Sequence, residues 1–324
     1  MPSAIEYCTE NQLVATGTEE IPLPRAPFEA VVQRFLHREV ELGSTEYEAI
    51  LEKNWQKIKN IEPSKPDSWK ERLLAQLFKT RSAVYKIWNQ QWKENLRLRE
   101  AFFSPDLAPT PYLWGQRLLM MTNAAGVLTR ILISKQIIEA LQPRNIVEIG
   151  CGDGLNLIFL ASMFPNIQFT GIELTPQGVQ TARTFQAQHV RLPEYMVCQF
   201  PEWITDRIAF KNITFKQGNA TKLTEKDNGF DLVLTCVALE QMEAFRHQAL
   251  SEISRIAKRW AVMTEPFRNF NSSGPSQIYI EKYNYFQGAI QDLPSYGLEP
   301  ILHCNDLPQK LNLRAGTVVC RKVR

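Results

Sequence analysis

Residues 147–161 read VEIGCGDGLNLIFLA, an apolar run that passes through three glycines into a second apolar run. Such a turn needs glycine because the backbone bends sharply and a ligand can approach without a Cβ in the way. A nicotinamide fingerprint, GxGxxG, would require glycine or alanine where this chain has Leu155. The stretch therefore predicts a strand, a ligand-binding loop and a helix, and it disfavours a dinucleotide-binding loop.

Short apolar runs alternate with helical segments from residue 142 onward, which is the pattern of βαβ units and a parallel sheet. We expect an α/β fold with a doubly wound, seven-stranded, mostly parallel sheet, in which two last strands at 298–303 and 316–321 form an antiparallel hairpin. The five expected crossover strands are NIVEIG (145–150), IQFTGIE (167–173), ITFKQG (213–218), FDLVLTCV (230–237) and AVMTEP (261–266).

The N-terminal half has helical spacing instead, as in Phe28, Val31, Val32 and Phe35. Ser68 followed by Glu71 predicts a capping box that opens a long helix.

The stretch SPDLAPTPYLWGQ (104–116) interrupts these helices, and a further helix is expected over 116–141. We therefore expect a helical or lid domain at 1–115 and a catalytic domain at 116–324.

The composition is that of an ordinary globular protein, with 44% hydrophobic and 22% charged residues. No apolar run reaches the roughly 20 residues of a membrane-spanning helix, and the first residues lack the features of a signal peptide. We expect a cytoplasmic protein. Six dispersed cysteines suggest neither a disulfide framework nor a zinc site, and a net charge of +3 does not imply binding to nucleic acid.

The motif ExGxGxG, Glu148 to Gly154, resembles that of the class I S-adenosylmethionine-dependent methyltransferases. The resemblance covers about 180 residues from Gln142 onward, and it implies a Rossmann-like methyltransferase core. It also implies that S-adenosylmethionine is the cofactor. An acidic residue at the loop suits the ammonium group of this ligand, which has no pyrophosphate. By resemblance, Glu148 and the backbone of Gly150, Cys151, Gly152 and Gly154 hold its methionine end.

The resemblance also assigns roles to three further positions along the chain. Glu173 ends the second strand, where the family uses an acid to accept hydrogen bonds from both ribose hydroxyls. Asn219 stands where the family commonly has an acidic residue near the adenine amine, and a turn-forming asparagine is its alternative role. Ala220 supplies backbone contact in this reading.

The segment LTCVALEQM (234–242) resembles the one that lines the donor and acceptor pockets of small-molecule methyltransferases. Cys236 is assigned to the cofactor and Gln241 to the acceptor. Candidate catalytic residues are Glu240, Glu265 and His303, each with a purely structural alternative. Further candidates for acceptor binding are Tyr112, Trp114, Arg268, Tyr279 and Tyr283, of which the first two could equally pack the N-terminal half onto the sheet.

Several acceptors are disfavoured because TCVAL lacks both the D/N/SPPY run and the Pro-Cys nucleophile of DNA methyltransferases. The aspartates of the metal-dependent catechol type are also missing, so no metal is expected. We expect methyl transfer to an oxygen or nitrogen of a small molecule, a natural product or a modified peptide, without a nucleic-acid or membrane partner.

Three alternatives stay open. One is a protein or RNA substrate, which would be favoured if six basic residues formed one face: Lys79, Arg81, Lys86, Lys93, Arg97 and Arg99. Another is a non-catalytic binding protein with this fold. The helical half could also form a homodimer instead of binding substrate.

Overall fold

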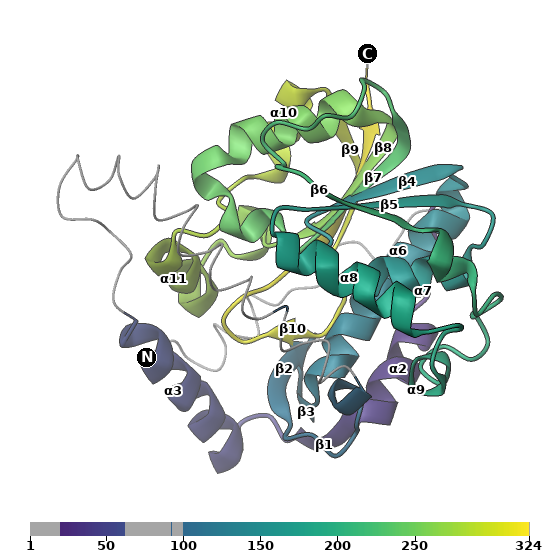
Figure 1. The fold of residues 1–324 in the computed structure, drawn as a ribbon. Coiled ribbons are helices and arrows are strands. Elements are labelled where there is room, and N and C mark those ends of the chain that lie inside the picture. The colour runs from purple at the N-terminus through teal and green to yellow at the C-terminus, as the bar shows by residue number, and fades with distance from the viewer. Residues whose placement is uncertain (1–19, 62–91, 93–99, 324) are drawn as a thin grey trace.

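The computed structural model describes residues 20–61, 92 and 100–323. Within them, a seven-stranded sheet has the order β6-β5-β4-β7-β8-β11-β9 (Figure 1). The first five of these strands are parallel to one another, and β11 is antiparallel to both β8 and β9. The predicted mostly parallel sheet and C-terminal hairpin are thus confirmed. The strands are β4 (Asn145–Ile149), β5 (Gln168–Glu173), β6 (Thr214–Gln217), β7 (Phe230–Cys236), β8 (Ala257–Glu265), β9 (Leu298–Cys304) and β11 (Gly316–Lys322).

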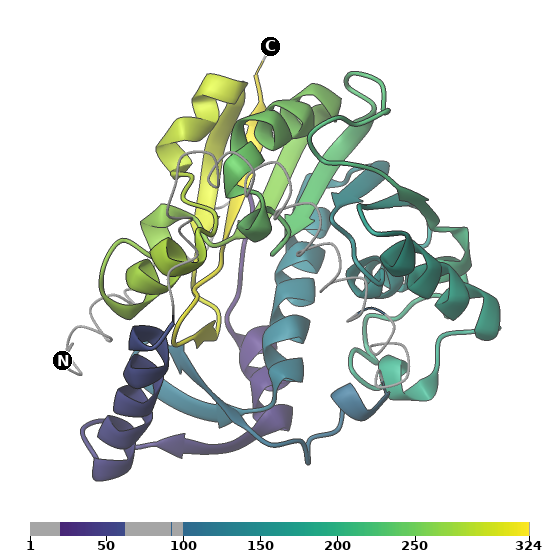
Figure 2. The same ribbon diagram turned by 60° about the vertical axis from the view of Figure 1, so that its left-hand side comes forward.

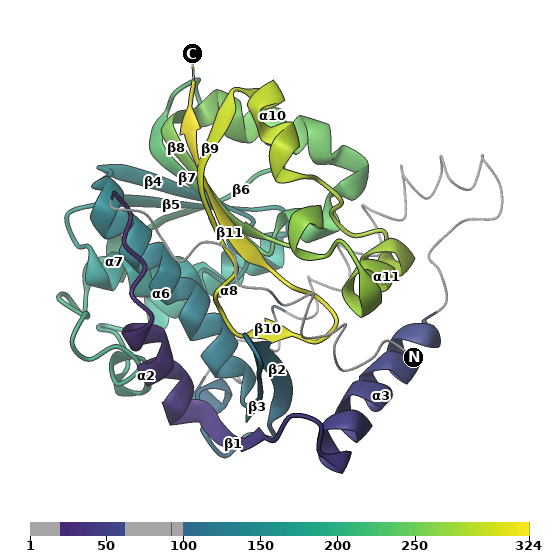
Figure 3. The same ribbon diagram turned by 180° about the vertical axis from the view of Figure 1, so that it is seen from behind.

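Helices cover both faces of this sheet (Figure 1 and Figure 3). Successive residues of a strand point to opposite faces, so Ile146 joins the core that contains α6 and α7, and Val147 joins the core that contains α10. The helices of this region are α6 (Asn123–Leu141), α7 (Leu155–Met163), α8 (Pro176–Gln188), α9 (Glu194–Val197), α10 (Arg246–Ile256) and α11 (Gly274–Tyr283). The same part of the described chain contains five 3₁₀ turns: η2 (Ala209–Asn212), η3 (Leu239–Gln241), η4 (Glu243–Phe245), η5 (Arg268–Phe270) and η6 (Ile290–Tyr296).

A second, antiparallel sheet was not predicted (Figure 2). Its four strands in the described chain have the order β1-β3-β2-β10. Because β10 lies between β9 and β11 in the sequence, this sheet joins the N-terminal segment to the end of the large sheet. The N-terminal segment also contains two helices, the first of which includes the predicted helical positions from Phe28 to Phe35. Its elements are α2 (Ala26–Phe35), β1 (Leu36–Val40), α3 (Thr45–Lys59), β2 (Thr110–Trp114) and β3 (Arg117–Met121), and β10 is Gln309–Lys310.

The helix expected over 116–141 begins only at Asn123, so this prediction was wrong at its start. The preceding residues form β3, which pairs with β2 around a turn where Gly115 has a φ of +60°. The division into domains at 115 and 116 stays a proposal, and it falls inside this hairpin turn. The predicted helix that opens at Ser68 and the six basic residues between 79 and 99 lie outside the described residues.

The described ranges, residues 20–61 and 100–323, contain no helix that is long and apolar enough to cross a membrane.

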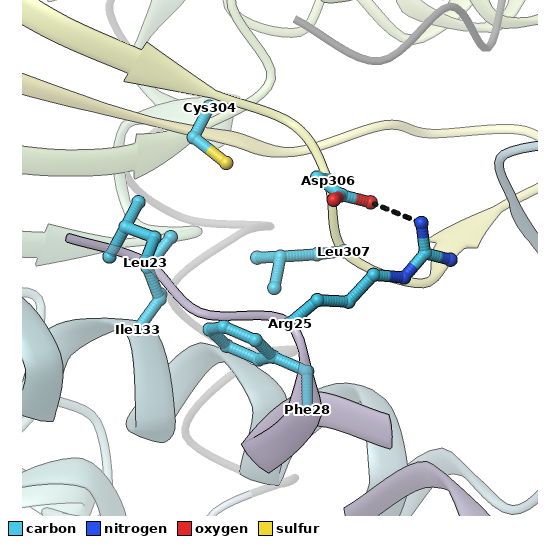
Figure 4. Close-up of a pocket in the computed structure, with 7 residues that line it drawn as sticks. All are labelled: Leu23, Arg25, Phe28, Ile133, Cys304, Asp306 and Leu307. Carbon is cyan, nitrogen blue, oxygen red and sulfur yellow. Dashed lines mark ion pairs between the residues drawn. The ribbon is translucent and has the colours of Figure 1, made fainter. Parts of the chain in front are cut away.

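Trp114 joins the two sheets. Its side chain is fully buried, and its Nε1 donates a hydrogen bond to Asp306 Oδ1 at 2.6 Å. The Arg25 guanidinium lies 4.4 Å from the centre of the Trp114 ring and 3.8 Å from Asp306. Arg25 and Asp306 also line a small pocket with five other residues (Figure 4), none of which was a predicted site residue: Leu23, Phe28, Ile133, Cys304 and Leu307. Trp114 is therefore a packing anchor, the alternative that the sequence left open.

Changing Trp114 to phenylalanine is expected to lower the free energy of unfolding by about 1–3 kcal/mol, because the buried Asp306 loses its donor. The change to alanine should remove about 3–5 kcal/mol, since a cavity is added. Urea unfolding measures both values. Trp260→Phe is the matched control, because its indole N–H has no hydrogen-bond partner among the described residues. Equal effects of Trp114→Phe and Trp260→Phe would contradict the anchoring role.

Candidate functional site

The glycine loop, residues 150–154, follows β4 between the carboxyl ends of β5 and β7. Gly150 N and Cys151 N both donate hydrogen bonds to Ile172 O of β5, at 2.8 Å and 3.2 Å. The loop is thus held against the strand that ends in Glu173. Carboxyl ends of neighbouring parallel strands are where open α/β sheets bind ligands.

All three glycines of the loop adopt left-handed backbone conformations, with φ of +75°, +54° and +77° at Gly150, Gly152 and Gly154. A Cβ at Gly150 would lie 2.5 Å from the Cβ of Ala238, in the segment after β7. A Cβ at Gly152 would lie 2.6 Å from the ring of Trp92. The glycines are therefore required both by conformation and by the close approach of other segments.

Glu148 lies beneath this loop with 1% of its surface exposed. Its Oε1 accepts a hydrogen bond from Asn156 Nδ2 at 2.7 Å, whereas its Oε2 has no partner among the described residues. Burial raises the pKa of Glu148 to about 7, against the opposing effect of the Asn156 hydrogen bond. A buried carboxylate oxygen without a partner is unfavourable, and a cationic ligand would stabilise it.

Glu173 is also buried, and its carboxylate faces the glycine loop. Its Oε2 accepts a hydrogen bond from Gly152 N at 3.1 Å, and its Oε1 accepts bonds from Thr175 N and Thr175 Oγ1, both at 2.8 Å. A carboxylate has about four acceptor positions, so a further donor can still bind. The structure thus fixes Glu173 beside the loop, and its predicted contact with a ribose stays a prediction.

Asn219 and Ala220 follow β6. The Asn219 Oδ1 accepts hydrogen bonds from Thr221 N at 3.0 Å and Thr221 Oγ1 at 2.9 Å. Such a pattern is typical of an asparagine that stabilises a turn, which was the alternative role. Ala220 is buried. Their predicted contacts with an adenine stay predictions.

The segment after β7 contains a strained residue opposite the loop. Val237 has a φ of +51°, a conformation in which a β-branched residue is a genuine outlier. Glu265, at the end of β8, accepts hydrogen bonds from Ala238 N at 3.0 Å and Leu239 N at 3.1 Å. Glu265 is fully buried. We therefore revise its predicted catalytic role: both of its oxygens are engaged in positioning the backbone after β7.

Burial raises the pKa of Glu265 to about 8, although the two backbone hydrogen bonds oppose this shift. Because the folded state binds this proton more tightly than the unfolded state, the associated stability is present below about pH 4.5 and is lost as pH rises through 8. The raised pKa of Glu148 likewise makes the stability fall as pH rises through about 7.

We expect the melting temperature to fall from about pH 5 to 8, and Glu265→Gln to flatten this slope because glutamine does not ionise. Thermal unfolding by circular dichroism measures the slope, with the exposed Glu299→Gln as control. An unchanged slope in Glu265→Gln would contradict the assignment.

Glu240 lies in η3, directly after this segment, and 7% of its surface is exposed. Its Oε1 accepts a hydrogen bond from Gln241 Nε2 at 3.1 Å, and its Oε2 has no partner among the described residues. Burial raises the pKa of Glu240. Of the three predicted catalytic residues, Glu240 is the one with a carboxylate oxygen that has no hydrogen-bond partner among the described residues.

Three tyrosines lie beside Glu240 and Gln241. The Tyr283 and Tyr285 rings stack with centres 5.2 Å apart, and the Tyr279 ring lies 4.7 Å from that of Tyr283. Burial raises the pKa of Tyr279 and of Tyr285, and the charge of Glu240 acts in the same direction on both. The predicted residues Tyr279 and Tyr283 thus come together with Glu240, whereas Tyr285 was not predicted.

Two basic residues near Glu240 were also missed. Burial raises the pKa of Glu240, and the charges of Arg130 in α6 and Lys310 in β10 both oppose this shift. Burial raises the pKa of Cys236 to about 12, so its thiol is protonated near neutral pH, and its predicted contact with the cofactor stays a prediction. Neither basic residue belongs to a sequence motif, because they come from distant segments.

Three further predicted residues are His303, Tyr112 and Arg268. His303 is on the edge strand β9, four strands from β4, which is roughly 19 Å at the usual strand spacing. We therefore no longer propose it as a catalytic residue. Tyr112 is buried, and its hydroxyl donates a hydrogen bond to Asn123 Oδ1 at 2.8 Å. Arg268 is exposed, and its contact with an acceptor stays a prediction.

No group of three or more histidine, cysteine, aspartate or glutamate side chains is placed to hold a metal ion, as far as residues 20–61, 92 and 100–323 are concerned.

Comparison with known proteins agrees with this geometry. A family model described as a methyltransferase domain matches residues 143–269. Norajmaline N-methyltransferase from Rauvolfia serpentina is 28% identical over 145 residues, which is 44% of this chain and 42% of that enzyme. The chain thus spans less than half the length of this relative. Residues 143–269 form a methyltransferase domain of the class I S-adenosylmethionine-dependent family.

The solved structures that are similar to this chain include the following two. The YcgJ protein from Bacillus subtilis has a TM-score of 0.42 and 12% identity, covering 60% of this chain and 99% of its own. Geranyl diphosphate C-methyltransferase from Streptomyces coelicolor has a TM-score of 0.40 and 11% identity, covering 56% of this chain and 73% of its own.

Proposed function

We propose that the whole chain is an enzyme that transfers a methyl group from S-adenosylmethionine to an oxygen or nitrogen of a small molecule. The observation that carries this proposal is the contact between the glycine loop and the segment after β7, where Gly150 leaves no room for a Cβ against Ala238. A donor held by this loop would therefore lie next to Glu240 and the tyrosines. A donor loop and a buried, available carboxylate therefore share one site.

The residues present fit the donor. The Oε2 of Glu148, which has no partner among the described residues, would be stabilised by its ammonium group, and Glu173 would accept a hydrogen bond from its ribose beside Gly152. When bound, S-adenosylmethionine supplies an electrophilic methyl group whose bonding electrons remain on sulfur as the acceptor lone pair forms the new bond. This chain must align the acceptor, which can lower the barrier by roughly 7–11 kcal/mol.

Glu240 is proposed to accept the proton that the acceptor loses. Its burial raises its pKa, and a base is most effective when its pKa is near the working pH. Gln241 holds one carboxylate oxygen through its hydrogen bond, which leaves the other oxygen for the acceptor. Glu265 holds the backbone of this segment in place.

Incubation of the full chain with donor labelled in its methyl group and with a fractionated cell extract tests the proposal. Mass spectrometry should find the label in small molecules. Label only in protein or RNA would overturn the choice of acceptor, and label in no fraction would overturn the activity itself.

A further inference from the structure

Arg130 belongs to α6, and Lys310 lies on the face of the small sheet that packs against this helix. Lys310 is directly opposite Tyr112 in the pairing of β10 with β2, so their side chains share one face of the small sheet. That face packs on α6, because a Cβ at Gly126 would lie 3.1 Å from the Tyr112 ring. Arg130 is one helical turn beyond Gly126 on α6.

Neither basic group forms an ion pair with another residue of the described ranges. None of the ion pairs formed within residues 20–61 and 100–323 includes Arg130, Lys310 or Glu240. Desolvation by the surrounding atoms lowers the pKa of Lys310 even though its surface is exposed, and the charge of Arg130 lowers it further. The fold thus holds two positively charged side chains close together although their charges repel each other.

Glu240 is the carboxylate whose charge acts on Lys310 in the opposite direction. One carboxylate, whose own pKa is raised by burial, does not balance two cations. An anion bound between Arg130 and Lys310 would supply the missing charge, and hydrogen bonds from charged donors to an anion are among the stronger ones in proteins.

The same site has an aromatic wall. The rings of Tyr279, Tyr283 and Tyr285 pack together with centres 4.7–5.9 Å apart. The residue after Tyr285 contacts the post-β7 segment, because Phe286 N donates a hydrogen bond to Glu240 O at 3.0 Å. An acceptor can therefore contact ring surfaces at one end and basic groups at the other.

We propose that the methyl acceptor is an organic anion whose carboxylate or phosphate binds between Arg130 and Lys310 and whose apolar part packs on the three tyrosines. This inference rests on the proposed function, because it assigns the acceptor class of the same site. The nucleophilic oxygen or nitrogen then lies toward Glu240.

Ion-exchange separation of the small-molecule extract before incubation with labelled donor tests the acceptor class. Label should enter the fraction that binds an anion exchanger. Label only in neutral or cationic fractions would overturn this inference and leave the proposed function intact, whereas label in no fraction would overturn both. Prior treatment with phosphatase distinguishes the two anions: loss of the labelled species identifies a phosphate monoester, and its persistence identifies a carboxylate.

Variants of the full chain test the residues with the labelled anionic fraction as substrate. Arg130→Met and Lys310→Met should each raise the KM for the acceptor roughly 10- to 100-fold, because each loses a charged hydrogen-bond donor. Lys310→Arg should restore most of the affinity. All variants should bind S-adenosylhomocysteine like the wild type, which shows that they are folded. The control is Lys258→Met, an exposed residue near the start of β8. An unchanged KM in both methionine variants would overturn the proposal.

Discussion

Gly150→Ala is expected to lower the affinity for S-adenosylhomocysteine roughly 100-fold. The new methyl group would lie 2.5 Å from the Cβ of Ala238, at a residue whose φ is +75°. The conformation costs about 1–2 kcal/mol and overpacking about 1–3 kcal/mol. This strain is relieved when the loop moves away from the segment after β7, and a displaced loop no longer fits the donor.

Gly43→Ala tests the effect of backbone strain without a steric contact at the new methyl group. Gly43 has nearly the same φ, +74°, but no atom lies within 4 Å of the position of its Cβ. We expect this variant to lose about 1–2 kcal/mol of stability and to keep its affinity for S-adenosylhomocysteine. Calorimetric titration measures both affinities, after circular dichroism has shown that each variant is folded. Wild-type affinity in Gly150→Ala would contradict the proposed role of the loop.

Glu240→Gln is expected to lower kcat by roughly two to four powers of ten while donor affinity stays unchanged, since the variant keeps the shape of the side chain but cannot accept a proton. In the wild type, kcat should rise with pH through the raised pKa of Glu240, and this rise should disappear in the variant. Initial rates with labelled donor across pH measure both effects.

Glu299→Gln serves as the control, because it removes an exposed carboxylate on the edge strand β9. If Glu240→Gln kept both the kcat and the pH profile of the wild type, Glu240 would not be the base.

The large sheet and the glycine loop could be predicted because their signals are local. Each parallel strand is a short apolar run, and the loop has its glycines within five residues. The small sheet could not be predicted in the same way. Its β1 pairs with β3, so that Val40 lies opposite Leu118, and nothing within either segment specifies so distant a partner.

The site shows the same difference between local and distant signals. Glu173 follows the loop at a recognisable position and is held beside Gly152. Arg130 and Lys310 approach Glu240 only because α6 and β10 are brought together by the second sheet. The role of Glu265 was also hidden, because a buried carboxylate that binds backbone N–H groups and one that faces a substrate look alike in a sequence.

Titration calorimetry of the unmodified full chain with S-adenosylhomocysteine tests most directly whether the glycine loop and Glu173 form a donor site. We expect saturable binding of one ligand per chain that is strongly weakened in Glu173→Ala, because the variant loses the carboxylate that holds Gly152 N. Absence of binding at millimolar ligand, or equal affinity in Glu173→Ala, would contradict the assignment of this site.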